Sequence, residues 1–545
     1  MFSFEITPLA NIFFVLTLIV FFSLFVVKNK NKDIVLHSIL LVSLGFIFYA
    51  DNFITFFIGW EMMSWSSYFI ISLTANKQTL QKYIAFNIAA GFSLLGAIIV
   101  IYGFCGTFIY SQIDFSLVPP VYTMIVSVLF LVAIFIKSGV VPFHHWVVDS
   151  YNESNHIFTT ILSAVISKVG IFTFLLVFTQ ITTIEYSEPI LFDIIAWAGV
   201  ITSIIATFKA INQDDMKKLL AYSSIAQVGY IITIMAIVGD ESSSSAIAAT
   251  LYYTIIHTFV KLLLFVNIAA IIYVTNQMKF SNLGALLYKY PINFVLLVIG
   301  IIALAGMPPL GGFSGKFLIY TTLLQEKQAL LLVAVMFSSA SAFLYCYKLV
   351  YGIYLGQSTN AKDTQYKKIP FSFYIPQFIS AFVVVLLGIF PSIIIPWINQ
   401  ILLSLNFEKL KFLSISNLYT PIASFNGFIV MVVFMILFIV ILAIFISLKN
   451  KTKKVKNRYD ISYCAEVPKE NVNLHYGYSM GYELKKISFI KTILENSSTI
   501  LWNKIKISTT HSASVIKNLY GLGVQNIIIL FILFFTIILF IKVGL

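Results

Sequence analysis

The stretch VLFLVAIFIKSGVVPFHHWVVD, from Val128 to Asp149, combines an apolar helix with residues that interrupt it. Lys137 lies inside the apolar run, and Gly139 and Pro142 follow it closely. A lysine near the middle of a bilayer costs about 2.5–3.5 kcal/mol, so it needs a partner or a water-filled cavity. Proline lacks an N–H and crowds the preceding turn, so the helix should break there and free carbonyl groups beside the charge. A broken helix with a buried charge is typical of an ion pathway.

The alternative is a lysine at a helix end that reaches the membrane surface. The apolar run does not stop at Lys137, however, because it extends from Val121 to Ser150. At about 1.5 Å per residue this segment makes roughly 45 Å of helix, which is more than one crossing of a bilayer core. We therefore favour an intramembrane position for this lysine.

The composition of the whole chain indicates a membrane protein. Of its 545 residues, 59% are hydrophobic and only 10% are charged, whereas soluble domains carry about 25% charged residues. The net charge of +13 does not indicate nucleic-acid binding, because the lysines lie in short loops, such as the one with Lys209 and Lys217, and in a block after Leu448. The three cysteines match no metal or disulfide spacing, and no nucleotide fingerprint or haem-type histidine pair is present. We expect no cofactor and no metal in this chain.

The hydropathy pattern predicts an all-α polytopic membrane protein with about fourteen transmembrane helices. Lysine-rich loops alternate with acidic ones, so the positive-inside rule places both termini outside the cytoplasm. The expected spans are roughly residues 9–28, 33–51, 52–74, 80–103, 121–150, 156–180, 189–208, 218–238, 246–275, 291–324, 329–355, 371–396, 424–448 and 524–543.

A second span repeats the logic of the first. It reads PINFVLLVIGIIALAGMPPLGGFSGKFLIYTTLL from Pro291 to Leu324, and glycines and prolines interrupt it between residues 306 and 312, ahead of Lys316. By loop parity the two broken spans run in opposite directions, which predicts two inverted-topology repeats, each with one broken helix. A phosphate-binding interpretation of GGFSGK fails, because Leu310 stands where the Walker spacing needs glycine.

Further ionisable residues fall inside predicted spans: Glu61, Lys168, and the pair His257 and Lys261, which are four residues apart and share one helix face. One such charge could pair for packing alone. A scaffold has no use for so many costly groups, whereas a proton relay needs titratable residues at intervals with water between them. We expect a hydrated axis in the order Glu61, Lys137, Lys168, His257, Lys261, Lys316.

Five ordered blocks carry a resemblance to a known family. They are GWEMMSWSSYFI, KSGVVPFHHWVVDSYNES, DDMKKLLAYSSIAQVGY, IIHTFVKLLLF and GMPPLGGFSGKFL. Between about Phe14 and Leu355 the chain resembles the antiporter-like membrane subunits of respiratory complex I (NADH-quinone oxidoreductase), Mrp-type sodium/proton antiporters and energy-converting membrane-bound hydrogenases. The resemblance implies proton translocation without a cofactor. It also implies an ion pair of Glu61 with Lys137, a bridging Lys168, a central connection at His257 and Lys261, and a terminal Lys316.

The chain departs from the family pattern in several places. It resembles a family member that is short of about two helices ahead of Glu61. Val147 and Val148 replace leucine and proline, Asn152 to Ser154 replace an alanine- and proline-rich turn, and Gln227 stands where many relatives carry histidine.

The region after the last long apolar run has a different character. Its segment YDISYCAEVPKENVNLHYGYSMGYELKKI, from Tyr459 to Ile487, faintly resembles the equivalent region of hydrogenase-type subunits. Apolar residues at loosely helical spacing among lysines predict an amphipathic helix within residues 482–519.

These observations define the expected organisation. The segments are residues 1–79 with the Glu61 helix, 80–240 as the first half-channel repeat, 241–448 as the second repeat and following helices, 449–522 as a cytoplasmic basic and amphipathic segment, and 523–545 as a C-terminal transmembrane helix. The expected function is proton translocation in a complex I-type or related redox complex, with no catalytic chemistry in this chain. A subunit of a multisubunit sodium/proton antiporter and a non-conducting scaffold are the alternatives. Expected partners are other membrane subunits, protons or sodium ions, and the lipid of a bacterial inner membrane or an equivalent energy-transducing membrane.

Overall fold

The computed structural model describes residues 3–27, 34–181, 189–239, 243–355, 367–449, 486–488, 490–491 and 497–520. The chain divides into two units, residues 1–482 and 483–545. The predicted basic run after residue 449, most of the tail that resembles hydrogenase-type subunits, and the predicted span 524–543 lie outside the described residues. In the second unit, α19 (Ser497–Tyr520) lies in the segment for which a helix is predicted.

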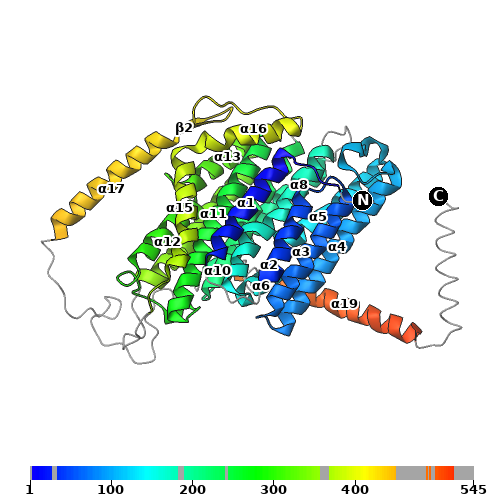
Figure 1. Cartoon of the computed structure of the whole chain (residues 1–545), viewed down its shortest axis with the longest axis horizontal. Coiled ribbons are helices and arrows are strands. Elements are labelled where there is room, and N and C mark those ends of the chain that lie inside the picture. The colour runs from blue at the N-terminus through cyan, green and yellow to red at the C-terminus, as the bar shows by residue number, and fades with distance from the viewer. Residues whose placement is uncertain are drawn as a thin grey trace. The chain divides into compact units, whose positions relative to one another are not determined.

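The first unit is a helical bundle (Figure 1). Its α-helices are α1 (Pro8–Phe25), α2 (Ile34–Phe48), α3 (Phe53–Ser72), α4 (Lys77–Cys105), α5 (Pro120–Ser138), α6 (His145–Glu153), α7 (His156–Ile161), α8 (Ser167–Ile181), α9 (Pro189–Ile211), α10 (Met216–Met235), α11 (Ser243–Thr275), α12 (Pro291–Ala305), α13 (Gly311–Gln325), α14 (Ala329–Val350), α15 (Phe371–Ile389), α16 (Ile395–Ser404) and α17 (Gly427–Lys449). Two π-helices, η4 (Leu162–Ile166) and η7 (Tyr351–Leu355), and short 3₁₀ turns interrupt or connect them. Strands β1 (Asn417–Tyr419) and β2 (Ser424–Asn426) form one antiparallel pair, with Leu418 opposite Phe425.

Polar residues fix where several helices begin. The side chains of Asn52 and Asn76 accept the N–H groups of Thr55 and Thr79 and so cap α3 and α4. Asp215 caps α10 by accepting two backbone N–H groups. Burial raises the pKa of the Asp215 carboxyl, although those two hydrogen bonds act in the opposite direction.

Ten helices in the described part of the chain are long and apolar enough to cross a membrane, and α2, α12 and the segment Pro391–Ser404 are shorter apolar helices. The predicted all-α polytopic fold is confirmed. The number fourteen stays a prediction. The span of α11 is completely buried inside the bundle, where it packs against α10, α12, α13 and α15. A helix that is apolar on all sides belongs in such a position, and the few polar groups on α11 are therefore enclosed.

Both predicted helix breaks are present, and they are built alike. Gly139 and Gly306 end α5 and α12 with left-handed φ values of 75° and 76°. In each break the next N–H turns back to a carbonyl five residues earlier, from Val140 to Phe135 and from Met307 to Ile302. This is the Schellman arrangement, which needs a residue without a Cβ penalty at the left-handed position. Each break also contains one cis peptide bond before a proline. The opposite directions of the two repeats across a membrane stay a prediction.

A third irregularity differs from the sequence pattern, which predicts one regular span over residues 156–180. The structure instead places the π-helix η4 (Leu162–Ile166) between α7 and α8. Single π-turns inside α-helices occur often at functional sites. This one lies directly ahead of Lys168.

Candidate functional site

The predicted basic residues are enclosed by protein. The exposed fractions are 1% for Lys137, 2% for Lys168, 2% for His257, 0% for Lys261 and 2% for Lys316. Lysines are almost never fully buried unless they are paired. Glu61 is half-buried. Among the described residues no group of three or more His, Cys, Asp or Glu side chains is placed to hold a metal ion.

Lys137 in the last turn of α5 is held by side chains from two other helices. Its Nζ donates to Ser64 Oγ at 3.0 Å and to Asn87 Oδ1 at 2.8 Å, and it lies 5.2 Å from the centre of the Trp60 ring. These partners come from α3 and α4. They give the ammonium two oxygen acceptors and one aromatic face in place of water.

Glu61 lies one turn before Ser64 on α3, against α4. A Cβ at Gly91 would overlap the Glu61 carboxylate, so this glycine makes room for it. Glu61 and Lys137 attract one another electrostatically, but they form no direct salt bridge. Within the described residues the ion pair closer than 4.0 Å is that of Lys82 with Asp149, at 2.6 Å. The expected contact is therefore not a direct pair here, and separation by one water stays a prediction.

Lys168 follows the π-helix. Its Nζ donates to the Ser163 carbonyl at 2.5 Å and to Ser167 Oγ at 3.1 Å. Ser163 also shares a hydrogen bond of 2.9 Å between its hydroxyl and that of Ser224 on α10. The partner groups of Lys168 are thus linked directly to α10.

Lys261 on α11 is bound to the same part of α10. Its Nζ donates to Ser223 Oγ at 2.7 Å and to the Leu220 carbonyl at 3.3 Å, and Ser224 Oγ donates to that carbonyl at 2.8 Å. Lys168 and Lys261 therefore share a continuous set of hydrogen-bonded groups. The sequence prediction that these two lysines belong to one interior network agrees with this geometry.

His257 lies one turn before Lys261 on α11. Both of its ring nitrogens are buried and make no hydrogen bond to a described residue. The ring is parallel to that of Tyr253, with the centroids 6.4 Å apart. It lies within electrostatic range of Lys168 and Lys261.

Lys316 on α13 uses the second break directly. Its Nζ donates to the carbonyls of Leu304 at 3.2 Å and Ala305 at 2.8 Å, which end α12, and to Ser339 Oγ at 2.7 Å. It also lies 5.4 Å from the centre of the Tyr230 ring. The expectation that the break frees carbonyls beside a charge holds at this lysine.

Sequence reasoning missed the polar face of α10. Ser223, Ser224, Gln227 and Tyr230 recur at spacings of three or four residues and make contacts around Lys261, Lys168 and Lys316. The spacing in AYSSIAQVGY is visible in the sequence as one helix face. Nothing in that spacing shows which neighbouring helices it meets.

Three further lysines are buried near helix ends. The sequence predicts a loop position for Lys209 and Lys217, but their exposed fractions are 6% and 3%. Lys217 Nζ donates to the carbonyls of Asn152 and Ser154 at 2.9 and 2.6 Å. Lys348 Nζ donates to the Ile211 carbonyl at 3.1 Å. The prediction of solvated loop lysines is wrong here, because the last turn of a helix offers carbonyls without a partner inside that helix.

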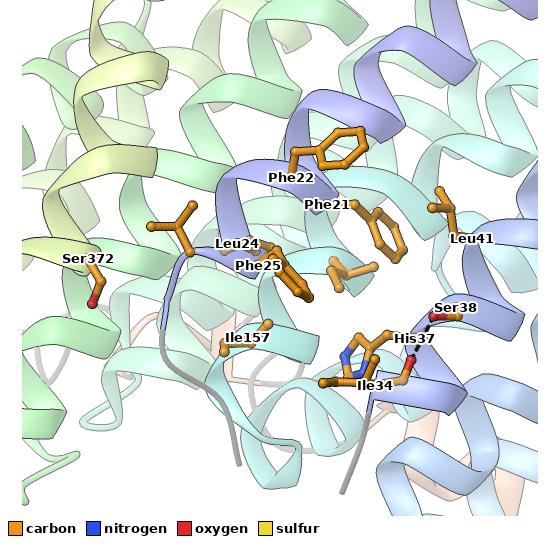
Figure 2. A pocket seen from close by; sticks show the side chains of 12 residues that line it. Phe21, Phe22, Leu24, Phe25, Ile34, His37, Ser38, Leu41, Ile157 and Ser372 are labelled. Carbon is orange, nitrogen blue, oxygen red and sulfur yellow. Dashed lines mark hydrogen bonds between the residues drawn. The ribbon is translucent and has the colours of Figure 1, made fainter. Parts of the chain in front are cut away.

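The grooves on the surface of the first unit are apolar. Figure 2 shows one of about 610 Å³ where α1, α2, α7 and α15 meet, lined by residues that include Phe21, Phe25, His37 and Ile157. None of the buried lysines lines it. Glu61 lines another groove of about 380 Å³ between α2 and α3.

The comparisons with known proteins agree with this architecture. Residues 50–341 match the family described as NADH:quinone oxidoreductase/Mrp antiporter, transmembrane. This match covers more than half of the chain, and the chain therefore belongs to that family. It is an integral, multi-pass membrane protein of the antiporter-like subunit class, as the resemblance of the five blocks implied.

Two curated relatives are similar at moderate identity. The first-named subunit of a Na(+)/H(+) antiporter from Alkalihalophilus pseudofirmus is 26% identical over 411 residues, which cover 69% of this chain and 50% of the relative. The chain thus spans about half the length of that protein. The putative antiporter subunit mnhD2 of Staphylococcus aureus is 28% identical over 386 residues, which cover 69% of this chain and 75% of the relative.

Three solved structures share the fold. A chain of the archaeal membrane-bound sulfane sulfur reductase, a respiratory membrane complex, is 27% identical with a TM-score of 0.83, covering 99% of this chain and 89% of that one. A chain of the Mrp complex from Dietzia has a TM-score of 0.72 at 19% identity, covering 99% and 56%. A chain of respiratory complex I from Thermus thermophilus has a TM-score of 0.58 at 18% identity, covering 72% and 88%. These similar chains are subunits of multisubunit membrane complexes.

Proposed function

We propose that this chain moves protons across a membrane through its buried lysines, as one subunit of a larger membrane complex. One observation carries the proposal. Each of the four lysines Lys137, Lys168, Lys261 and Lys316 bonds to one serine hydroxyl and to at least one carbonyl or amide oxygen.

This pair of partners suits a group that changes its protonation state. A carbonyl oxygen accepts only, so it stabilises the charged ammonium. A serine hydroxyl accepts from the ammonium and, after rotation, donates to the neutral amine. A lysine with both partners therefore keeps a hydrogen bond in either state. Burial disfavours the charged form of lysine, so the two states lie closer in free energy than in water.

The buried lysines whose partners are carbonyls alone form a contrasting group. Lys217 and Lys348 donate to backbone carbonyls. A neutral amine at these positions would lose its bonds, so these sites favour a fixed charge. We assign them to holding helix ends together rather than to proton movement.

The arrangement of the helices supports a path between the four lysines. Gly170 lets α8 approach α5 so closely that a Cβ there would overlap Ser138 Oγ, which brings the neighbours Lys137 and Lys168 onto adjacent helices. The hydroxyls of Ser163 and Ser224 join the surroundings of Lys168 to those of Lys261. Beyond them, α10 leads past Gln227 to Tyr230 beside Lys316. Water can bridge the remaining gaps.

Glu61 supports a position beside a further membrane subunit. Its carboxylate is half-buried and lines a groove of apolar side chains between α2 and α3. A carboxylate that faces lipid is costly, whereas one that faces a polar group of a neighbouring subunit is not. We place the next subunit of the complex on this groove.

For the identity of that complex, the likeness to the sulfane sulfur reductase over 99% of the chain supports a redox complex in an energy-transducing membrane, such as a bacterial inner membrane. Membership of a sodium/proton antiporter is the second candidate, which the curated relatives favour. A non-conducting scaffold does not explain why the four lysines each have a hydroxyl partner.

The test is proton flux in vesicles that contain the whole assembled complex. Lys261→Ala should reduce flux by about a hundredfold or more, because a titratable group in the path is lost. Lys348→Ala is the matched control, a buried lysine with a carbonyl partner, and should conduct normally once assembled. Equal flux in the two assembled variants would overturn the proposal.

A further inference from the structure

Between Lys261 and Lys316 the structure places a side chain that does not titrate. Gln227 on α10 is completely buried. Its Oε1 accepts a hydrogen bond from the Tyr253 hydroxyl, and its Nε2 donates to Tyr345 Oη at 3.2 Å. The amide thus joins α11, which carries Lys261, to α14, which carries the Ser339 partner of Lys316.

Gln227 occupies the middle of the polar face of α10. Ser223, one turn earlier, bonds to Lys261, and Tyr230, one turn later, has its ring beside Lys316. The Tyr230 hydroxyl shares a hydrogen bond of 3.0 Å with Ser338 Oγ, the neighbour of Ser339. A path along α10 from one lysine to the other therefore passes the amide.

The amide fixes the direction of both tyrosine hydroxyls. An amide oxygen only accepts and an amide NH₂ only donates, so Tyr253 must donate to Gln227, and Tyr345 must accept from it. The Tyr345 hydroxyl proton is then left to point away from Gln227. Two phenols without the amide between them would each be free to turn. An apolar side chain here would leave a dry layer between the two lysines.

We propose that Gln227 is a positioning residue that orients Tyr253 and Tyr345 as the hydroxyl bridge for proton passage between Lys261 and Lys316. This inference rests on the proposed proton translocation. The amide gains and loses no proton itself; protons move over the hydroxyls and the water that they hold. A histidine here can accept and donate hydrogen bonds as well, and it adds a titration of its own.

The experiment compares Gln227→Met with Gln377→Met in vesicles that hold the assembled complex. Gln377 on α15 is also completely buried, and it accepts a hydrogen bond from Asn267 at 2.8 Å and donates to a backbone carbonyl. The two variants thus lose similar bonds in the same unit. Gln227→Met should lower flux at least about tenfold, while Gln377→Met leaves the flux of the assembled complex unchanged. Thermal unfolding of the two should be similar.

Gln227→His supplies a readout that a structural role would not change. It should restore most of the flux and make it depend on pH between about 5 and 8, where imidazole changes charge, a dependence that the wild-type protein and Gln377→His lack. Unchanged flux in Gln227→Met, or an equal loss in both methionine variants, would overturn the inference. Lys261→Ala in the same vesicles separates the two levels: normal flux there refutes proton translocation itself, whereas lost flux there beside normal flux in Gln227→Met refutes only the bridge.

Discussion

The two broken helices share a backbone but use it differently. In the first break, Lys137 precedes the left-handed glycine and bonds to side chains of α3 and α4. The Ile136 carbonyl beside it is taken by Trp146 Nε1 at 2.9 Å. In the second break, Lys316 follows the glycine and bonds to the last carbonyls of α12. A break thus supplies a binding site for a charge only where no other donor occupies its carbonyls.

The largest expected effect concerns Lys316. Lys316→Ala removes the titratable group but leaves a good helix former, so the complex should assemble while proton flux falls to the background of empty vesicles. Lys316→Arg should fail as well, because arginine does not release its proton. Flux is measured in vesicles, and subunit content is checked on a native gel. Lys409→Ala, in an exposed loop, is the control. Normal flux in assembled Lys316→Ala would favour the scaffold alternative.

An intermediate effect should distinguish the two glycines. Alanine at Gly139 or Gly306 costs roughly 1–2 kcal/mol for the left-handed backbone. At Gly306 the new Cβ would also overlap the Lys316 side chain, whereas at Gly139 it would lie 2.7 Å from Val147 Cγ2. Both variants should unfold at a lower temperature. Only Gly306→Ala should also lower flux per assembled complex, by about tenfold. An equal loss of flux in both would show that the first break holds its lysine in the same way.

The sequence predicts the parts of this site that are costly. Lys137 and Lys316 stand out because charge is expensive in a membrane, and glycine and proline mark the breaks beside them. The partners could not be predicted in this way. Ser64 and Ser339 are neutral, cost little in a helix and bond to lysines that lie 73 and 23 residues away. Their role appears only when the packing of the helices is known.

The same reasoning explains the other differences. The π-helix before Lys168 depends on how α7 and α8 pack, because its sequence, LSAVI, is compatible with a regular helix. Lys217 resembles a loop residue in the sequence because a charge beside a predicted span is usually solvated. Its burial follows from two carbonyls that the chain brings to it from residues 152 and 154. Long-range packing rather than local pattern decides such positions.

The smallest expected effect lies at the ion pair of Lys82 and Asp149, which joins α4 to the helix after the first break. The two charged atoms are 2.6 Å apart, but the side chains are 39% and 31% exposed. Partly exposed pairs contribute about 0.2–1 kcal/mol, because water competes for both charges. Lys82→Ala should therefore lower thermal stability slightly and leave flux unchanged, and a double-mutant cycle with Asp149→Ala measures the coupling between the two. Since Lys137 is bound by α3 and α4 rather than by its own break, loosening α6 should not move it. A clear loss of flux in Lys82→Ala would show instead that α6 does position Lys137, and that the two breaks act more alike than their hydrogen bonds indicate.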